Sequence, residues 1–287
     1  MSKPTETNNL KINLSFNGKT EEVYYKFDVK HMSQRHIFEK LKSGVFYEED
    51  LTKFLFKVMR EGDTFLDVGA HIGYFSILAS YLVSEEGKVI AVEPNSENFA
   101  WLQVQIDLNK RQNIKPIKAV VCGADGTVEF FKNSDNDGGH SLWDPGLHFF
   151  NKLSKEAPAK DWHEGIRFET IVKQFDVEYC RAVKIDTEGA ELIILKSGGN
   201  FFSPERVPFV ICEINDFGLS QLGTNQMELR SWMKERGYMT FLFSKNDHLP
   251  IFVPNETTIV SKFVSNVLFS TPEAMGIIWP AVDPYSN

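Results

Sequence analysis

The sequence has few cysteines, and none of them stands in a CxxC pair. The three are Cys122, Cys180 and Cys212. An odd number without paired spacing indicates neither a disulfide framework nor a zinc ribbon. A reducing compartment, the cytoplasm, is therefore expected.

Long apolar runs and an excess of positive charge are also missing. No stretch approaches the roughly 18 apolar residues of a membrane span, and the opening MSKPTETNNL has no apolar leader core. The net charge is -8, so no general positive field attracts nucleic-acid phosphates or anionic lipids. We therefore expect a protein without a membrane span or a nucleic-acid partner, acting on a small molecule or glycan.

Strand-like and helix-like segments alternate along most of the chain. The predicted strands are TFLDV, KVIAV, KPIKAVV, AVKID, PFVICEI and YMTFLF, most of them followed by a helical pattern. Such alternation predicts an α/β fold with a parallel sheet and crossover helices. SNVLFS, residues 265–270, lies close enough to YMTFLF to form an antiparallel pair.

Two segments fall outside this alternation. Residues 10–28 alternate apolar and polar side chains around Asn17-Gly18, which predicts a hairpin. Residues 132–165 form a long polar stretch, and so long a connection is typical of a functional lid or a disordered segment. We predict an N-terminal hairpin and connector at 1–44, and a main domain at 45–287 with a substrate-side insert at 132–165.

A glycine turn joins the first buried strand to its helix in FLDVGAHIGYFS, residues 65–76. Ligands of open parallel sheets bind at this position, where Gly69 can take a positive φ and Gly73 allows close packing. The spacing is not GxGxxG, and Asp67 would repel phosphates. Glu93 ends the next strand, 20 residues after Gly73, where an acid can bind both ribose hydroxyls. The pattern predicts a nucleoside ligand without phosphates.

These segments resemble a known family. DVGAHIGYFS followed by AVEPN resembles motifs I and II of class I S-adenosylmethionine-dependent methyltransferases, and residues 46–269 resemble the FkbM family within them. FYEEDL, CGADGTVEFF, VKIDTEGAELIILKSGG and SNVLF contribute to the resemblance, and KIDTEGAE is its most specific part. Members of the family more often carry Asn where this chain has His71.

The resemblance implies a Rossmann-like doubly wound sheet, mostly parallel with an antiparallel last strand. It also implies S-adenosyl-L-methionine as cofactor and transfer of its methyl group, commonly to a hydroxyl. The cofactor-binding residues that it implies are Asp67, Gly69, Ala70, His71 and Gly73 around the methionine part, Glu93 at the ribose, Asn95, Cys122 and Gly123 near the adenine, and Asp186.

The acids of KIDTEGAE follow the fourth strand and are catalytic candidates. Asp186 would lie beside the sulfonium and the acceptor, where it could orient the nucleophile or take its proton. The plainer alternative is that Asp186 caps the helix and Glu188 complements its dipole. Glu191 is expected to be structural. A Mg²⁺ or Ca²⁺ ion held by Asp186, Glu188 and Glu213 is chemically reasonable, but no ligand spacing specifies it and no metal is predicted.

His140 lies in the insert and is the third catalytic candidate. An imidazole with a pKa near 6.5 suits the acceptance of a hydroxyl proton near neutral pH. The alternative is a solvated loop histidine, and His148 and His163 are weaker candidates. Tyr47 and Glu48 precede the first core helix, and either cover the ligand or only begin that helix.

We predict O-methylation of a hydroxyl on a small molecule, sugar or natural product. The alternatives are N-methylation on the same fold, a nicotinamide-dependent dehydrogenase, and a non-catalytic nucleoside-binding protein. The sequence does not identify the acceptor or the oligomeric state.

Overall fold

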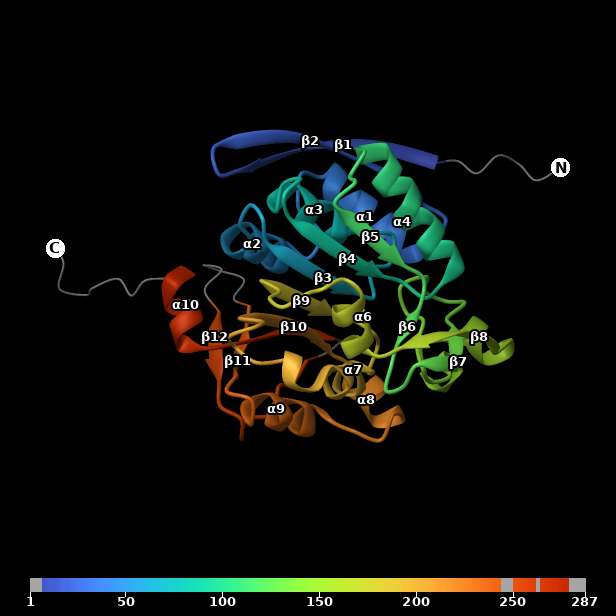
Figure 1. Ribbon diagram of the computed structural model, residues 1–287. Coiled ribbons are helices and arrows are strands. Elements are labelled where there is room, and N and C mark those ends of the chain that lie inside the picture. The colour runs from blue at the N-terminus through green and yellow to red at the C-terminus, as the bar shows by residue number, and fades with distance from the viewer. Residues whose placement is uncertain (1–6, 244–249, 262–263, 279–287) are drawn as a thin grey trace.

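The central sheet has eight strands in the described part of the computed structural model, which comprises residues 7–243, 250–261 and 264–278. Its strand order is β12-β11-β13-β10-β9-β3-β4-β5 (Figure 1). The strands are β12 (Ile251–Val253), β11 (Met239–Leu242), β13 (Ser265–Ser270), β10 (Phe209–Ile214), β9 (Ala182–Ile185), β3 (Thr64–Val68), β4 (Lys88–Val92) and β5 (Ile114–Ile117).

The predicted strand directions are confirmed. Strands β10, β9, β3, β4 and β5 are parallel, and β13 runs antiparallel to both of its neighbours, β10 and β11. The fold is therefore a Rossmann-like sheet with an antiparallel last strand. Because β13 lies beside β10, its Asn266 pairs in register with Glu213.

Both faces of this sheet are buried, which explains the unbroken apolar runs of its strands. In β3, Phe65 packs into the core on one face, while Leu66 and Val68 pack into the core on the other. The helices that cover the first face are α2 (Glu49–Val58), α3 (Tyr74–Leu82) and α4 (Ser96–Asn109), and those on the second are α6 (Phe168–Gln174), α7 (Glu191–Gly198) and α9 (Gln226–Lys234). The result is the three-layer arrangement of Figure 1.

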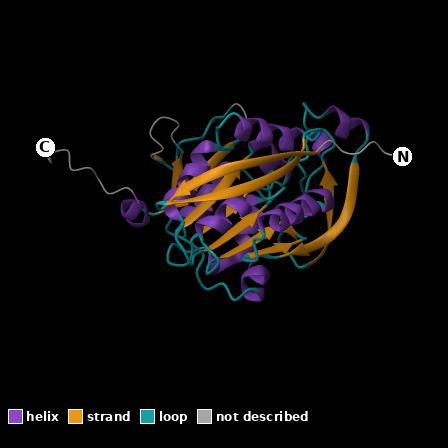
Figure 2. Cartoon of the chain, turned by 90° about the horizontal axis from the view of Figure 1, so that it is seen from above, coloured by secondary structure: helices purple, strands orange, loops and turns teal. Residues whose placement is uncertain are grey.

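The N-terminal hairpin is confirmed and packs on the outside of the helical layer (Figure 2). It consists of β1 (Thr7–Phe16) and β2 (Lys19–Asp28), and α1 (Met32–Lys42) follows. The Gln105 side chain of α4 hydrogen-bonds the main-chain N–H and C=O of Lys26. These bonds and the buried Tyr25 join the hairpin to the same core as α3.

The stretch at 132–165 is more ordered than the sequence predicts. Residues 159–166 form β8 (Ala159–Ile166), which pairs antiparallel with β7 (Gly126–Lys132) and parallel with β6 (Val120–Val121) in a second, three-stranded sheet. Between β7 and β8 lie a short 3₁₀ turn, η1 (Pro145–Leu147), and α5 (Lys152–Glu156). Here Asp135 accepts three main-chain N–H groups, those of residues 152–154. The polar composition thus reflects loop-stabilising hydrogen bonds.

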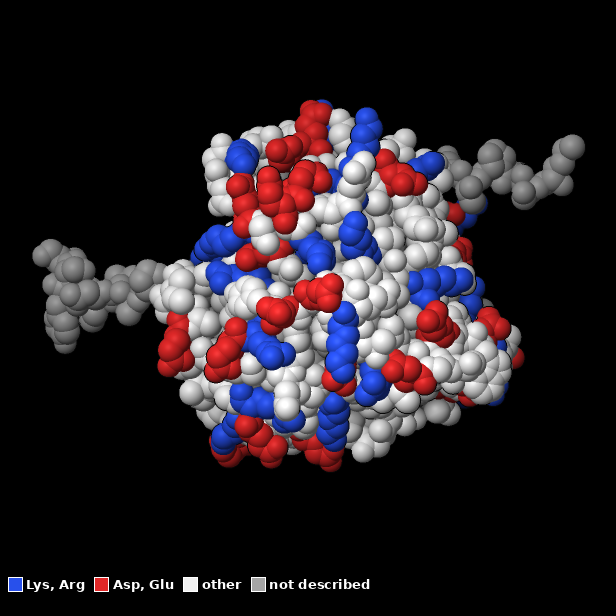
Figure 3. Space-filling view, in the orientation of Figure 1, with Lys and Arg blue, Asp and Glu red and all other residues white. Residues whose placement is uncertain are grey.

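Three elements complete the described chain: η2 (Gly199–Phe201), α8 (Asp216–Gln221) and α10 (Pro272–Ile278). The outer ends of both predicted domains, residues 1–6 and 279–287, lie outside the described residues. Over the described chain, no helix combines the length and apolarity that crossing a bilayer requires. Figure 3 shows acidic and basic side chains interspersed on one face of the molecule.

Candidate functional site

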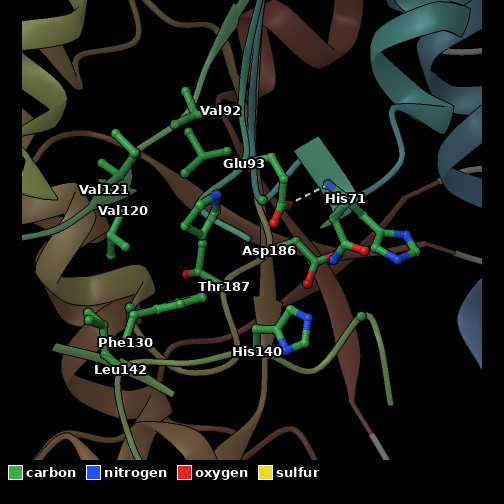
Figure 4. Close-up of a pocket in the computed structure, with 17 residues that line it drawn as sticks. His71, Val92, Glu93, Val120, Val121, Phe130, His140, Leu142, Asp186 and Thr187 are labelled. Carbon is green, nitrogen blue, oxygen red and sulfur yellow. Dashed lines mark hydrogen bonds between the residues drawn. The ribbon is translucent and has the colours of Figure 1, made fainter. Parts of the chain in front are cut away.

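A cavity opens at the carboxyl ends of β3, β4 and β9, where the sequence predicts a ligand. Its atom-free space, open mouth included, is about 530 Å³. Figure 4 shows apolar side chains on one side of it and polar ones on the other. We call it the apolar cavity, and its lining includes Val68, Gly69, His71, Val92, Glu93, Asn98, Ala119, Val120, Val121, Phe130, Gly138, His140, Leu142, Asp186 and Thr187.

The glycine turn lies at the bottom of the apolar cavity, between its apolar side and its polar side. Gly69 has φ +83°, and a Cβ there would lie 1.9 Å from the main-chain oxygen of Asp186. Gly73 has φ +89°, and a Cβ there would lie 2.5 Å from a methyl carbon of Leu102 in α4. Both positions favour glycine because of their positive φ, and at Gly69 the main chain of Asp186 also leaves no space for a Cβ. Asp67 is buried below the turn and accepts a hydrogen bond from the Ser76 hydroxyl. It lines neither this cavity nor the second one that adjoins it.

Glu93 reaches the cavity from the end of β4. Its two carboxylate oxygens accept the main-chain N–H groups of His71 and Asn95, each at 2.8 Å. Burial raises the pKa of the Glu93 carboxyl to about 7, although the nearby His71 and these hydrogen bonds oppose the shift. The cavity thus has a buried acid of fixed orientation, suited to accept hydrogen bonds from a pair of hydroxyls.

The predicted adenine neighbours are displaced from this cavity. Cys122 is buried, and its thiol donates to the main-chain oxygen of Ala124, while Gly123 lines a separate groove near Arg167. Strand β6 ends at Val121, so residues 119–121 face the cavity instead. The residues that line the cavity at this strand end are thus the ones directly before the predicted pair, Cys122 and Gly123.

Asn95 also has a different position from the predicted one. Its side chain accepts the main-chain N–H groups of Glu97 and Asn98, so it caps α4 and does not line the cavity. Asn98 lines it instead, and the Asn98 side-chain amide donates to the main-chain oxygen of Asp137. An Asn before a helix is a strong capping signal, which the sequence interpretation did not use.

His71 connects the glycine turn to the insert. Its Nε2 lies 3.0 Å from Asp137 Oδ2, and the other Asp137 oxygen accepts the N–H of Ser33 in α1. Burial alone would raise the pKa of Asp137, but the hydrogen bond and charge of His71 outweigh it and lower that pKa. Asp137 precedes Gly138, which lines the apolar cavity and also the second cavity beside it. This contact holds the insert over the ligand space.

His140 lies where the sequence predicts, over the strand ends, but its chemistry differs. Its Nδ1 accepts the main-chain N–H of Asn133, so a neutral ring carries its proton on Nε2. Burial lowers the pKa of His140 to about 4. The imidazole therefore has no free acceptor nitrogen at neutral pH and is better suited to donate a hydrogen bond. His148 and His163 line neither cavity.

A second cavity adjoins the first and is lined by acids. We call it the acidic cavity. It shares Gly69, His71, Gly138 and Asp186 with the apolar one. Its further lining residues are Ser33, Ile37, Tyr47, Glu48, Ala70, Tyr74, Phe75, Asn136, Lys184, Glu188, Glu213 and Val264.

The acidic cavity concentrates carboxyl groups around a single lysine of its described lining. Lys184 is 3% exposed, and its Nζ lies 2.6 Å from Asp186 Oδ2. Burial would lower the pKa of Lys184, but Asp186, Asp67 and Glu48 outweigh it and raise that pKa, so the lysine is charged. Burial raises the pKa of Glu188 to about 8 and that of Glu213 well above its ordinary value, with Asp186 adding to both.

Glu191 is structural, as expected. Its Oε1 accepts three hydrogen bonds, from the main chain and hydroxyl of Thr187 and from the N–H of Gly189. Glu191 thereby shapes the turn that presents Asp186 and Glu188. The structure thus brings together Gly69, Ala70, His71, Glu93, His140, Asp186 and Glu188 from the predicted set, together with Tyr47 and Glu48.

Lys184, Asn98 and Asp137 are site residues that the sequence interpretation missed. A lysine inside the buried strand AVKID was a signal for the first, because a buried charge requires a partner. Asp137 had no signal, since only the fold brings it to His71. Among the described residues, no three His, Cys, Asp or Glu side chains are grouped closely enough to hold a metal ion.

The two cavities fit the parts of S-adenosylmethionine. The apolar side suits an adenine, Glu93 suits a ribose diol, and the acidic cavity suits the positive sulfonium and ammonium groups. At Gly69 the main chain of the turn lies directly against that of Asp186, because an added Cβ would lie 1.9 Å from the Asp186 oxygen. The two residues therefore meet where the cavities adjoin.

One family model and several solved structures are similar to this chain. The family model described as the Methyltransferase FkbM domain matches residues 67–239. Methyltransferase FkbM from Methylobacillus flagellatus KT is 14% identical, covering 76% of this chain and 50% of that one, with a TM-score of 0.43. SMU.1697c from Streptococcus mutans, in complex with SAH, is 12% identical over 77% and 96%, with a TM-score of 0.44.

Precorrin-6y C5,15-methyltransferase from Geobacter metallireducens GS-15 is 13% identical, covering 79% of this chain and 90% of that one, with a TM-score of 0.41. The search of curated proteins gives no match.

Proposed function

Because this chain belongs to the FkbM methyltransferase family, and so is an S-adenosylmethionine-dependent methyltransferase, we propose that it methylates a hydroxyl group. The acceptor would be a small molecule, sugar or natural product. The observation that carries the proposal is the pair of adjoining cavities that share Gly69 and Asp186.

In this proposal, the apolar cavity holds the adenosine part of the cofactor. Glu93 accepts the ribose hydroxyls, and its two main-chain hydrogen bonds fix its orientation before binding. Ala70 and His71 lie beside the methionine part. Asp67 acts below them by holding Ser76 at the start of α3.

The acidic cavity would hold the charged groups of the cofactor on the side of Gly69, and it holds the acceptor on the side of Glu213. When bound, the cofactor supplies a methyl group on a positively charged sulfur, which a nucleophile displaces in line. The acceptor oxygen forms the new C–O bond as the C–S bond breaks, and its proton has to leave. Asp186 lies at the junction of the cavities, and its Oδ2 is fixed by Lys184. Its other oxygen can then orient the hydroxyl and receive the proton.

Positioning supplies most of the acceleration in this mechanism. Well-oriented neighbours contribute roughly 7 to 11 kcal/mol, and a general base adds about 10²- to 10⁴-fold. Asp186 is the better candidate for the base, because His140 has its Nδ1 occupied. His140 instead covers the cavity and can donate from Nε2.

The test is to incubate the protein with S-adenosylmethionine labelled in its methyl group and with the small-molecule fraction of cells that contain the protein. We expect one labelled class of product, with an O–CH₃ group identifiable by NMR. Label that appears on nitrogen would favour N-methylation instead, and label confined to RNA or protein would contradict the proposed acceptor class.

A further inference from the structure

Four residues, one from each of four neighbouring strands, form a row across the carboxyl edge of the sheet. Val68 pairs with Ile185, and Ile185 with Cys212, so the next residues, Gly69, Asp186 and Glu213, lie level with one another. Asn266 pairs directly with Glu213 and extends the row. Neighbouring strands lie about 4.8 Å apart, so Glu213 is about 10 Å from the glycine turn. The cofactor side and the far end of the acidic cavity are thus separate places.

At the far end of this row, two buried acceptor atoms have no donor. Glu213 is 8% exposed, it lines the acidic cavity, and its Oε2 has no hydrogen-bond partner among the described residues. The same holds for the Oδ1 of Asn266. Asn266 has a fixed orientation, because its amide nitrogen donates to Glu48 Oε2. Buried polar atoms nearly always have partners in native proteins, so a ligand with several N–H or O–H donors would complete this end.

The charged residues of the acidic cavity favour N–H donors of a cation over O–H donors of a neutral molecule. Glu48, Asp186, Glu188 and Glu213 all line the acidic cavity, whereas Lys184 is the one lysine or arginine in its described lining and is already paired with Asp186. A neutral polyol would satisfy hydrogen bonds but would leave Glu188 and Glu213 protonated, as their raised pKa values make them in the empty site, whereas a cation would supply the counter-charge beside which they ionise. A buried charge is costly unless it is paired. A cation with three N–H donors meets both requirements.

An inorganic ion meets them less well. No group of three His, Cys, Asp or Glu side chains that could hold a metal ion occurs among the described residues. An alkylammonium group needs no such coordination sphere and can take separate hydrogen bonds from Glu213 and its neighbours.

We propose that the methyl acceptor carries an amine, bound as an ammonium by Glu213 with Asn266 and Glu188 beside it, while a hydroxyl of the same molecule lies at Asp186. This inference rests on the proposed function and narrows its acceptor class to amino alcohols, such as amino sugars. The amine is a recognition group in this arrangement and is not the atom methylated.

The test compares two probes that differ only at one carbon, glucosamine and glucose. Both are titrated by saturation-transfer NMR into protein saturated with S-adenosylhomocysteine, so that the ammonium group of the cofactor product already occupies its own place. We expect glucosamine to bind at least about tenfold more tightly, the ratio that one hydrogen bond to a charged group supports.

Two variants assign that preference to Glu213. Glu213→Gln keeps the shape but cannot ionise beside a bound cation, and should reduce the ratio to within about threefold without changing affinity for S-adenosylhomocysteine. The exposed Glu235→Gln is the matched control and should keep the full ratio. Equal binding of the two sugars, no binding of glucosamine, or an unchanged ratio in Glu213→Gln would each overturn the proposal.

A second arm separates this inference from the proposed function. Acetylating the free amines of the small-molecule fraction in water, before incubation with labelled cofactor, should remove most of the labelled product. If labelling survives acetylation, the amine is not required although methyl transfer stands. If the untreated fraction gives no labelled product while glucosamine binds as expected, the proposed transfer fails and the ammonium site stands.

Discussion

At the scale of single residues, the site depends on backbone at Gly69 that has no room for a side chain. Gly69 and Gly62 have nearly the same φ, +83° and +82°, but only at Gly69 would a Cβ meet another atom, the Asp186 oxygen. The two glycines therefore separate the cost of a positive φ from the cost of a collision.

We expect Gly69→Ala to abolish measurable binding of S-adenosylhomocysteine and to lower the melting temperature. Gly62→Ala should cost only about 1 kcal/mol of stability, as alanine at a positive φ does, and should bind normally. Calorimetry and thermal unfolding of both variants check this. Normal binding by Gly69→Ala would show that the turn does not approach the ligand.

Asp186 and His140 are distinguished by their hydrogen bonds. Asp186→Asn keeps the contact with Lys184 but cannot take a proton, so we expect kcat to fall about 10²- to 10⁴-fold with affinity for S-adenosylhomocysteine nearly unchanged. His140→Gln should have a smaller effect on kcat, because His140 accepts no proton. A larger loss in His140→Gln than in Asp186→Asn, measured on the labelled product, would reverse these two roles.

At the scale of elements, the insert is held to the glycine turn by the contact of Asp137 with His71. We expect Asp137→Asn to release S-adenosylhomocysteine about tenfold faster, since the insert covers the cavity, with stability changed by less than about 1 kcal/mol. Stopped-flow dissociation measures the rate. Asp161→Asn, at an exposed position of β8, is the control. An unchanged dissociation rate in Asp137→Asn would mean that the insert does not limit release.

The elements that the sequence predicts well are those with regular patterns. The hairpin around Asn17-Gly18 and the buried strands β3, β4, β9 and β10 were predictable because turn chemistry and apolar runs are local signals. Helices α1 and α6 were missed, and β8 was taken as part of a polar loop. Trp162 and His163 of β8 have their strand partners in β7, where the paired residues Glu129 and Val128 lie 33 and 35 positions earlier in the chain.

At the scale of the whole molecule, buried acids link stability to pH. Burial raises the pKa of Glu93 and of Glu191 to about 7 in the folded chain, from an unfolded value near 4.5. The folded state then holds protons that the unfolded chain has released. The stability from these groups is complete below about pH 4.5 and is lost as the pH rises through about 7.

We therefore expect the free energy of unfolding to fall between pH 5 and pH 8, by an amount on the order of 3 kcal/mol for each such group. Urea unfolding at several pH values measures it. Glu191→Gln should flatten the dependence. A free energy of unfolding that rises steadily over this range would show that these carboxyls are ionised in the folded protein.

The molecule as a whole also shows why the site was only partly predictable. Asp186 and Glu93 follow strands directly, so the sheet edge places them together from sequence alone. Asn98 reaches the apolar cavity from a helix face, and Asp137 reaches His71 through the insert. Glu213 of β10 lines the acidic cavity and pairs with Asn266 of β13. Such convergence depends on long-range packing, for which the sequence gives no local pattern.

The central claim is that the cavity at the ends of β3 and β4 binds the cofactor through Glu93. Calorimetric titration with S-adenosylhomocysteine tests it in the natural protein, in Glu93→Ala and in the exposed control Glu235→Ala. We expect binding in the natural protein that tightens as the pH rises through about 7 and ionises Glu93. Affinity should fall roughly 10- to 100-fold in Glu93→Ala and stay unchanged in the control. Equal affinity in Glu93→Ala, or no binding by the natural protein, would contradict the claim.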